Sequence, residues 1–515
     1  MARPMAPKLS KTEYIMYREC PNNTWVRRHR PDIHGQYEMS EFEQALATMG
    51  NEVEELARGM FPGGFLVERR SEGAQELTAK LVVEQTPVIF QAVFATDKYL
   101  AATDVLVWNA GAGAYDLYEI KMSSTEDEGE DGTVKKNKKK EEQFDNDLAF
   151  QANVVEACGV KLNRKYLVRL NKQYVRRGDI DYTQLFIFED KTEAMVVVQE
   201  NAVHGMQHAY EYLTKAEKPE GHCPCYYRGR SAHCTTFAFI NPDVPAYSVH
   251  DLNRIGQSKK YLEELLHAGV LHVKDVPIDE RLKTKKLNQV RAHLSQEPIV
   301  DMEALAEELG KLEYPLYFLD YETFPTAVPP FSGYRPYQHI VFQYSLHVLE
   351  HPDAELKHYG DLILGGDPSA KIAEALVSHI GPKGSVISWY KTFENSRNKE
   401  LAALLPEHRE FFLNLVARTY DLMDIVEHQH YVHPGFMGRA SIKKVLPVLV
   451  PGLSYKDLPV KSGTDAIEGY RQLTREVLVG EEAAQKQRDM LEYCKLDTLA
   501  MVEIWRHFKG VAGGV

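Results

Sequence analysis

The chain has 515 residues, of which 44% are hydrophobic and 26% are charged, and its formal net charge at pH 7 is −13. This length exceeds one ordinary hydrophobic core, so about two or three domains are expected. No apolar run is long enough to span a membrane and the first residues lack a signal-peptide core, so we expect a cytoplasmic protein without a membrane partner. The negative charge excludes a nucleic-acid partner only weakly, because basic clusters such as 281–286 occur locally.

The first 240 residues are predicted to form an α/β domain. Residues 8–60 are predicted to be helical. Strands are predicted from β-branched and aromatic runs at 88–94, 101–108, 115–122, 165–170 and 184–189. Residues 123–143 are of low complexity, acidic and then lysine-rich, which predicts a disordered loop. A helix over 147–158, closed by Gly159, follows this loop.

The rest of the chain is predicted to contain two further parts. Residues 241–310 are polar and helical in pattern, which is typical of a linker module or a DNA-contacting helical hairpin. Residues 311–515 start with strands and continue into helices, which predicts a second α/β domain.

Acidic and basic residues gather on the strands of the first domain. Asp104 lies in one predicted strand, and Glu119 and Lys121 lie two residues apart in the next, so that Glu119 and Lys121 share a face. Carboxylate oxygens suit Mg²⁺ or Mn²⁺, and a neighbouring lysine can hold a water molecule and offset negative charge.

This order of residues resembles the RecB-like branch of the PD-(D/E)XK nuclease superfamily, with its restriction-endonuclease-like fold. The resemblance implies that Asp104, Glu119 and Lys121 are the core catalytic set and that Gln151 belongs to the helix after the core strands. Glu54 stands where many relatives have a metal-binding histidine, which makes it the expected upstream ligand.

A set of four cysteines flanks this domain: Cys20, Cys223, Cys225 and Cys234. Clustered cysteines in a cytosolic protein favour a metal over disulfides. The layout of one upstream and three downstream cysteines resembles CRISPR-associated RecB-like nucleases and AddB nuclease subunits, which implies a 4Fe-4S cluster. Zinc is the alternative, with His222 or His233 as a further ligand. Cys158 and Cys494 are interpreted as ordinary buried residues.

The second α/β domain carries the sharpest motif of the chain. Asp320 and Glu322 are two residues apart on a strand, and Tyr493 and Asp497 are four residues apart on a helix, so each pair shares a face. Three carboxylates can hold divalent cations, and the tyrosine can orient a water molecule. The motif resembles the DnaQ-like (DEDDy) exonucleases of the RNase H-like fold, which trim 3′ ends.

The resemblance implies one further acidic residue. Glu394, after the predicted buried strand 386–389, is the first candidate, and it replaces an aspartate that is usual in that family. Asp421 and Asp424 are the alternatives, although helix capping or a solvated face explains both.

Five residues are candidates for nucleic-acid contacts in this domain: Tyr334, Tyr337, Arg439, Lys443 and Lys444. The tyrosines lie in an aromatic segment that can stack on terminal bases, and packing under a proline-rich loop explains them equally well. The basic residues lie in a small loop entering a helix, which suits phosphate contacts.

The order of the two halves resembles a bacterial family in which a RecB-like nuclease is fused to a DnaQ-like exonuclease. We therefore expect a metal-dependent nuclease with two active sites, which acts on DNA ends or single strands in repair or antiviral defence. The alternatives are an RNA-processing exonuclease, a nuclease with one active site whose second domain only binds nucleic acid, and a non-enzymatic scaffold.

Overall fold

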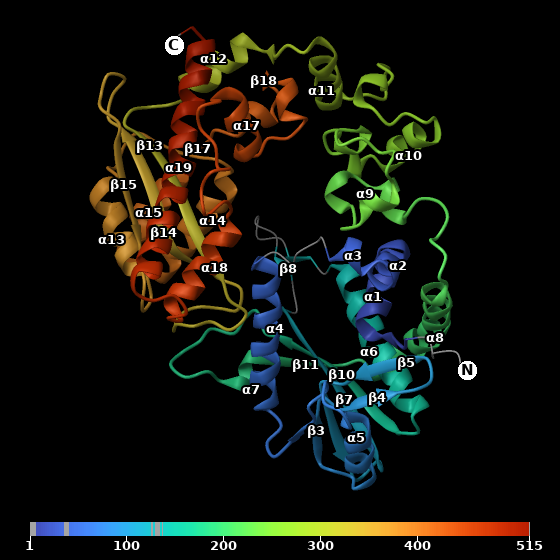
Figure 1. Cartoon of the computed structure of the whole chain (residues 1–515). Coiled ribbons are helices and arrows are strands. Elements are labelled where there is room, and N and C mark those ends of the chain that lie inside the picture. The colour runs from blue at the N-terminus through green and yellow to red at the C-terminus, as the bar shows by residue number, and fades with distance from the viewer. Residues whose placement is uncertain (1–6, 36–40, 125–126, 129–133, 136, 514–515) are drawn as a thin grey trace. The chain divides into compact units, whose positions relative to one another are not determined.

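The computed structural model describes the chain apart from residues 1–6, 36–40, 125–126, 129–133, 136 and 514–515 (Figure 1). It divides into two compact units of mixed helices and strands. The first unit comprises Met1–Tyr226, His233–Pro242 and Thr326–Gln338, and the second comprises Tyr227–Ala232, Asp243–Pro325 and His339–Val515. Among the described helices, none is both long enough and apolar enough to cross a membrane.

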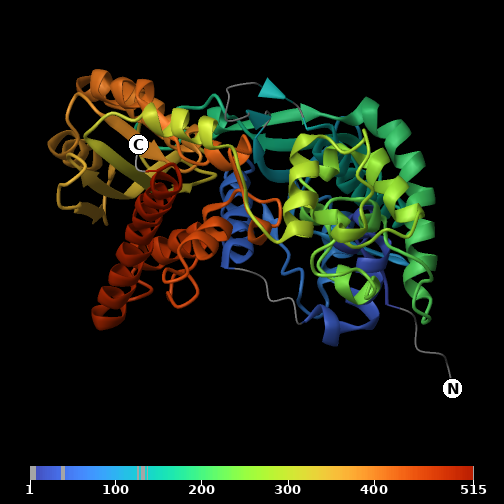
Figure 2. The ribbon, with the colours of Figure 1, turned by 90° about the horizontal axis from the view of Figure 1, so that it is seen from above.

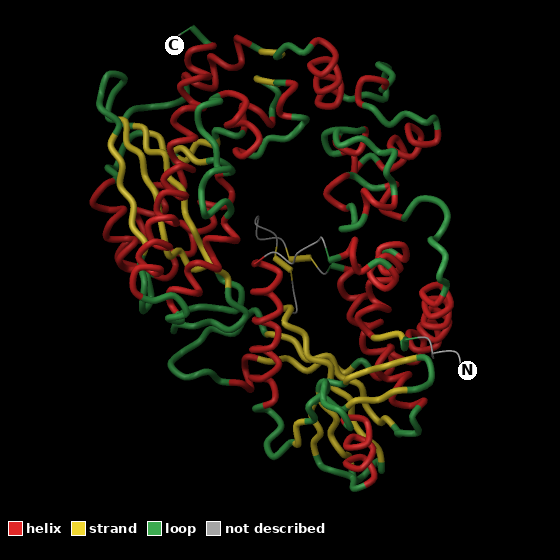
Figure 3. The backbone as a smooth tube through the Cα atoms, in the orientation of Figure 1, coloured by secondary structure: helices red, strands yellow, loops and turns green. Residues whose placement is uncertain are grey.

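The main sheet of the first unit has six strands in the order β11-β10-β7-β6-β3-β2. Their bounds are Phe186–Asp190, Leu162–Leu170, Ala114–Ser124, Val105–Asn109, Val88–Phe90 and Phe65–Leu66. β6 and β7 form an antiparallel hairpin, and helix α6 (Lys138–Ala157) then leads to β10, which pairs with β7 in parallel. The strands are drawn in yellow in Figure 3. Of the catalytic residues expected in this half, Glu119 and Lys121 therefore lie on β7, a middle strand of this sheet, and Gln151 lies on α6.

Two of the predicted strands are divided by a change of sheet. β4 (Val93–Ala95) and β5 (Tyr99–Ala102) join β1 (Leu9–Ser10) in a separate sheet, so neither 88–94 nor 101–108 is one continuous strand. The first break falls at Gln91, whose φ of 53° ends the extended conformation. Its backbone N–H donates to the carbonyl of Asp104 at 3.1 Å. Asp104 consequently occupies the turn between β5 and β6 and does not lie within a strand.

The helices of the first unit include several that were predicted and some that were not. The predicted helical region holds α1 (Lys11–Glu19), α2 (Pro21–His29), α3 (Pro31–His34) and α4 (Glu41–Arg58). α5 (Ala74–Val83) and α8 (Thr192–Thr214) were not predicted. α6 begins at Lys138, so the end of the 123–143 segment is helical, whereas 125–126, 129–133 and 136 of that predicted loop lie outside the described residues.

The sheet of the second unit has five strands in the order β15-β14-β13-β16-β17. Their bounds are Lys357–Leu362, His339–Leu349, Leu316–Pro325, Ser385–Ser388 and Thr419–Asp421. Side chains alternate along β13, so Leu316 and Phe318 join the core under α19 (Gly480–Val511). Tyr317 and Leu319 join the opposite core, which α13 (Ser369–His379), α14 (Lys391–Leu404) and α15 (Arg409–Ala417) complete. The long red helix in Figure 2 is α19.

The region predicted as a separate linker module belongs to the second unit. It contains α10 (Lys259–His267), α11 (Thr284–Ser295) and α12 (Met302–Gly310), and β12 (Ile299–Val300) pairs with β18 (Tyr431–Val432). The buried Gln289 side chain attaches α11 to neighbouring loops, because its oxygen accepts from Asn253 N at 2.7 Å and its nitrogen donates to Tyr247 Oη at 2.9 Å.

The segment 326–338 follows β13 in sequence but packs within the first unit. The guanidinium of Arg176 donates to the carbonyls of Pro329 and Pro330 at 3.0 and 2.7 Å. Its backbone N–H donates to the carbonyl of Tyr334 at 3.0 Å, and Ala327 is buried in a core cluster of this unit. The predicted domain over 311–515 therefore does not coincide with one unit, because residues 326–338 belong to the first.

Candidate metal centres

The first candidate centre lies where β7 meets the turn before β6. Glu119 and Lys121 alternate along β7 with Ile120, which enters the core. The carboxylate of Asp104 accepts the Ile120 N–H at 2.7 Å, because pairing of β6 with β7 brings the preceding turn against this strand. Gln151 reaches the same place from α6, and its amide donates to Glu119. The structure thus brings together these four residues from the sequence prediction.

Glu119 is the most buried charge of this centre, with 1% of its surface exposed. Its Oε1 atom lies 2.7 Å from the Lys121 ammonium and 2.7 Å from the Lys11 ammonium. Burial acts to raise the pKa of Glu119, but the two lysines hold it well below its ordinary value. Burial and the Glu119 charge raise the pKa of Asp104 well above its ordinary value. A cation bound beside Asp104 would stabilise it as a carboxylate.

Glu54, the expected upstream ligand, also approaches this centre from α4. Its charge contributes to the raised pKa of Asp104. Its Oε1 atom accepts from Gln91 Nε2 at 2.5 Å and pairs with Arg58 at 2.7 Å. Glu54 is therefore already engaged by two donors.

Two residues of this centre were missed by sequence reasoning. Asp147 pairs with Lys121, and Lys11 pairs with Glu119. Asp147 lies four residues before Gln151 in α6, so helical spacing could have identified it. Lys11 is separated from Glu119 by 108 residues, and nothing local in the sequence marks it.

The four cysteines meet in the first unit. One sulfur atom each from Cys20, Cys223, Cys225 and Cys234 lies within 4.8 Å of all the others. Hydrogen bonds from Cys20 and its neighbours hold the pKa of Cys223 well below its ordinary value and lower that of Cys225 to about 7. These residues can hold a metal, because thiolates are soft ligands that suit zinc and iron–sulfur centres.

The two histidines considered as zinc ligands have other contacts. The His222 ring stacks on Tyr226 with 3.7 Å between ring centroids, and its Nδ1 atom lies 2.8 Å from the Asn241 side-chain oxygen. The His233 ring stacks on Phe237 at 3.5 Å. The ligand group in the described residues consists of the four sulfur atoms.

The second candidate centre lies between β13 and α19. Asp320 and Glu322 extend from β13 toward α19, which supplies Tyr493 and Asp497. Burial and neighbouring carboxylates raise the pKa of Asp320 and of Glu322 well above their ordinary values. Burial raises the pKa of Asp497 to about 6. Several acids that resist ionisation together form a site for cations, because a divalent ion offsets their repulsion.

Glu394, the first candidate for the further acidic residue, also faces this centre. It lies in the first turn of α14, only 4% of its surface is exposed, and its Oε2 atom has no hydrogen-bond partner. Burial raises its pKa, and the charge of Asp320 adds to this effect. An unpaired buried carboxylate oxygen beside other acids fits a cation ligand.

The two alternatives to Glu394 have structural explanations. Asp421 accepts from the backbone N–H groups of Tyr390, Lys391 and Met423 at 2.9, 2.8 and 3.1 Å. Asp424 pairs with the Lys391 ammonium at 3.5 Å. Asp421 therefore secures the start of α14, which carries Glu394.

Sequence reasoning missed Tyr455 and underestimated Cys494 in this centre. The Tyr455 hydroxyl donates to Asp497 Oδ1 at 2.7 Å. Cys494 is buried as expected, and its thiol lies 3.8 Å from Asp320 Oδ2, in a group with Asp320 and Glu322. Cys158 is exposed, contrary to expectation, because it lies just beyond the end of α6.

The residues predicted to contact nucleic acid differ in their surroundings. The Lys443 ammonium lies 5.3 Å from the Tyr493 ring centroid and 5.5 Å from that of Tyr455, at the border of the acidic centre. Lys444 is exposed. Arg439 pairs with Asp251 at 3.2 Å, so its charge is partly used in the second unit itself.

The expectation for the aromatic segment is not met at Tyr334. Its ring is 2% exposed within the first unit, so it is not available to stack on a base. Tyr337 is half-buried and packs against the core cluster that contains Ala327. Packing under the proline-rich loop, the alternative reading, explains both tyrosines.

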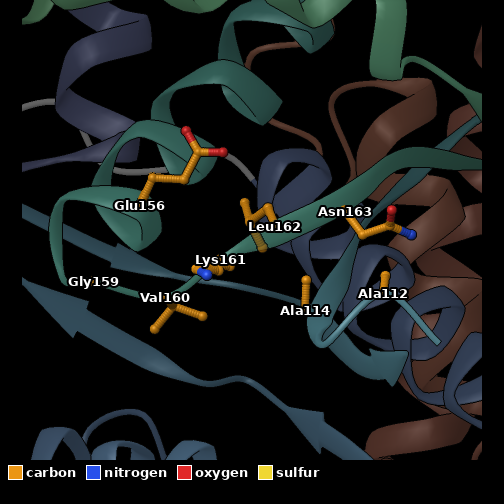
Figure 4. Close-up of a pocket in the computed structure, with 8 residues that line it drawn as sticks. All are labelled: Ala112, Ala114, Glu156, Gly159, Val160, Lys161, Leu162 and Asn163. Carbon is orange, nitrogen blue, oxygen red and sulfur yellow. The ribbon is translucent and has the colours of Figure 1, made fainter. Parts of the chain in front are cut away.

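A shallow pocket of about 510 Å³ lies elsewhere in the first unit, between the β6–β7 turn and the start of β10 (Figure 4). Glu156 is its one acidic lining residue, and that carboxylate pairs with Lys165 at 3.2 Å. None of the residues predicted as catalytic lines this pocket, so it is separate from the candidate centres.

Comparison with known proteins gives limited matches. A family described as "Domain of unknown function (DUF2779)" matches residues 317–441. "Uncharacterized protein MG366 homolog" from Mycoplasma pneumoniae is 26% identical over 212 residues, covering 38% of this chain and 32% of the relative. "Uncharacterized protein UU173" from Ureaplasma parvum serovar 3 is 26% identical over 223 residues, covering 39% and 32%. The matched region thus spans about a third of each relative. No solved structure matches.

Proposed function

We propose that the protein is a Mg²⁺- or Mn²⁺-dependent nuclease with two active centres, which acts on DNA ends or single strands. The observation that carries this proposal is the second centre, where Asp320, Glu322, Glu394 and Asp497 meet and one buried carboxylate oxygen is left without a partner. Carboxylate oxygens are the preferred ligands of Mg²⁺ and Mn²⁺. When bound, such ions would activate water and stabilise the attacking and the leaving oxygen in the hydrolysis of a phosphodiester bond.

The topology of the second unit supports the resemblance to RNase H-like exonucleases. In chain order its strands stand as third, second, first, fourth and fifth, with the first three antiparallel and the last two parallel to the first. Asp320 and Glu322 lie on the first strand and Asp497 on the last helix, as the DnaQ-like resemblance requires. The family match over 317–441 includes Asp320, Glu322 and Glu394.

Residues of the second centre can divide the remaining work. Tyr493 is buried beside Asp497, and its hydroxyl can orient an attacking water molecule. Tyr455 fixes Asp497 through its 2.7 Å hydrogen bond. Lys443, which borders the centre, can contact the phosphate of a strand end.

The first centre supports a second nuclease site of PD-(D/E)XK type. A hairpin, a helix and a parallel strand, formed by β6, β7, α6 and β10, bring the candidate residues together. Asp104 and Glu119 would hold the cation. Lys121 lies 2.7 Å from Glu119 and can hold the attacking water and offset negative charge.

The four cysteines are proposed to hold a structural metal group. The resemblance implies a 4Fe-4S cluster, and zinc is the alternative. Zn–S bonds of about 2.3 Å give tetrahedral S···S edges of about 3.8 Å, which is compatible with four sulfur atoms that lie within 4.8 Å of one another. Iron and zinc content of anaerobically purified protein distinguishes the two, and a brown colour indicates iron.

The proposed activities are tested separately with end-labelled DNA and RNA in Mn²⁺. In an Asp320→Ala background, Lys121→Ala should abolish the remaining cutting by the first centre. In a Lys121→Ala background, Asp320→Ala should abolish 3′-end trimming of a 5′-labelled strand. Retention of cutting by the protein that carries both substitutions, at the rate of the parent, would contradict the proposal. Preference for RNA over DNA would favour the alternative of an RNA-processing exonuclease.

A further inference from the structure

Lys11 contributes a second ammonium group to the first centre. Its Nζ atom lies 2.7 Å from Glu119 Oε1, the same atom that Lys121 approaches at 2.7 Å. The Lys11 side chain is 23% exposed, and Asp147 and Asp104 also act on its charge. Two ammonium groups therefore share one oxygen of a carboxylate that is expected to bind a metal.

The backbone holds Lys11 firmly in this position. Ser10 pairs with Leu100 in the small sheet and caps α1, because the Glu13 N–H donates to its hydroxyl at 3.3 Å. Tyr14 stacks on Phe150 of α6, next to Gln151. Lys11 is thus presented to Glu119 by ordered elements on both sides, which a freely moving surface lysine would lack.

The charges indicate how many cations this centre can accept. The carboxylates of Asp104, Glu119 and Asp147 face the ammonium groups of Lys11 and Lys121, and the nearby Glu54 is paired with Arg58, which leaves one net negative charge. One divalent cation gives one net positive charge, which one phosphodiester neutralises. A second divalent cation would leave the buried centre with an uncompensated charge, which is costly at low dielectric.

We infer that Lys11 takes the place of a second divalent cation, so that the first centre binds a single Mg²⁺ or Mn²⁺. This inference rests on the proposed nuclease function and adds its cation requirement. Lys11 acts through Glu119 and is a positioning residue. The second centre differs in this respect, because Lys443 acts on Asp320 and Glu322 only through its charge and forms no salt bridge with them among the described residues.

The test counts bound Mn²⁺ by electron paramagnetic resonance in a background with Asp320→Ala and Asp497→Ala, which removes ligands of the second centre. The background protein should bind one Mn²⁺. With Lys11→Met, binding should tighten by at least about tenfold or rise to two ions per chain, because a positive charge near the ligands is lost. The dependence of cutting on Mn²⁺ concentration should become steeper.

Lys8→Met is the matched control, because the Lys8 ammonium contacts the Thr96 carbonyl and no carboxylate of the centre. Its Mn²⁺ count and affinity should equal those of the background. Lys11→Arg keeps the charge and should also bind one ion, which covers the case in which Lys11→Met does not fold.

Two results would overturn the inference: unchanged Mn²⁺ number and affinity in folded Lys11→Met, or two ions in the background or in Lys11→Arg. These outcomes are separable from failure of the proposed nuclease. A background protein that binds Mn²⁺ in the expected number but cuts neither DNA nor RNA contradicts the nuclease activity alone.

Discussion

Glu394 shows how a single side chain can be unfavourable for folding and suited to a metal. Its Oε2 atom is buried without a hydrogen-bond partner, and its pKa is raised by burial. Leaving such a group unpaired costs about 1–3 kcal/mol of stability. The cost is offset when a cation binds, because the carboxylate then gains a ligand.

Glu394→Gln should therefore stabilise the metal-free protein. The raised pKa means that the wild type loses stability as pH rises above the ordinary glutamate value of 4.5 toward the pKa of the folded state. The advantage of the variant should grow from near zero at about pH 4.5 to about 1 kcal/mol or more at about pH 8. Denaturant unfolding of both proteins at several pH values, in the presence of a chelator, measures this difference in unfolding free energy.

Saturating Mn²⁺ should reverse this order, because only the wild type retains the ligand. Glu410→Gln serves as the control variant, because it makes the same change at an exposed position. An advantage of Glu394→Gln that does not change with pH would contradict the role assigned to the carboxylate.

Residues that local periodicity places together could be predicted from sequence. Glu322 shares a strand face with Asp320 because side chains alternate, and Asp497 follows Tyr493 by one helical turn. Tyr455 and Lys11 could not be predicted, because each reaches its carboxylate from a distant part of the chain. Tyr334 shows the reverse case, since an aromatic segment looks the same in sequence whether it packs or binds.

Among the elements, α1 connects the cysteine cluster to the first centre. The helix has nine residues and runs from Lys11, beside Glu119, to a C-cap at Cys20. A metal held by Cys20 therefore fixes one end of the helix whose other end carries Lys11. Folding free energy contributed by such a metal extends to the elements that its ligands join.

Cys234→Ser should lower metal content and loosen α1. We expect a loss of about 2 kcal/mol or more in unfolding free energy and faster amide hydrogen exchange over 11–29. Cys158→Ser is the matched control, because Cys158 is exposed and lies outside the cluster. Equal metal content and equal exchange in the two variants would refute the role of the cluster.

Helices and strands could be predicted where the hydrophobic pattern and the length of a run indicated the same element. The residues at which these elements begin and end were harder to predict. The run 101–108 reads as one strand, but the chain changes sheet at Thr103, whose N–H donates to the Ala92 carbonyl at 2.9 Å. That tertiary hydrogen bond carries no local sequence signal. The lysine-rich composition of 123–143 predicts a loop, but α6 begins within this segment at Lys138, with Asn137 as its N-cap.

At the scale of the whole molecule, no single cut in the sequence separates the two units, because the segment 326–338 belongs to the first unit and interrupts the second. It lies between β13 and β14 of the second unit and contributes Ala327 to a core of the first. Sequence periodicity identified two α/β halves but could not show this exchange, because the segment carries no boundary signal.

A fragment of residues 1–242 should consequently be less stable than the first unit of the full chain. It lacks the partners of Arg176 and the buried Ala327, so its unfolding midpoint should fall by several degrees. Adding a peptide of residues 324–340 should restore part of the loss, and a scrambled peptide should not. A fragment that unfolds at the midpoint of the full chain would contradict this assignment.

The most direct test of the central claim is hydrolysis of 5′-labelled single-stranded DNA in Mn²⁺ by the wild type, beside the Lys121→Ala/Asp320→Ala double variant. We predict shortening of the strand by the wild type, loss of activity in chelator, and at least about a hundredfold slower cutting by a double variant that keeps the unfolding midpoint of the wild type. An equal rate for the two proteins would contradict the assignment of both centres.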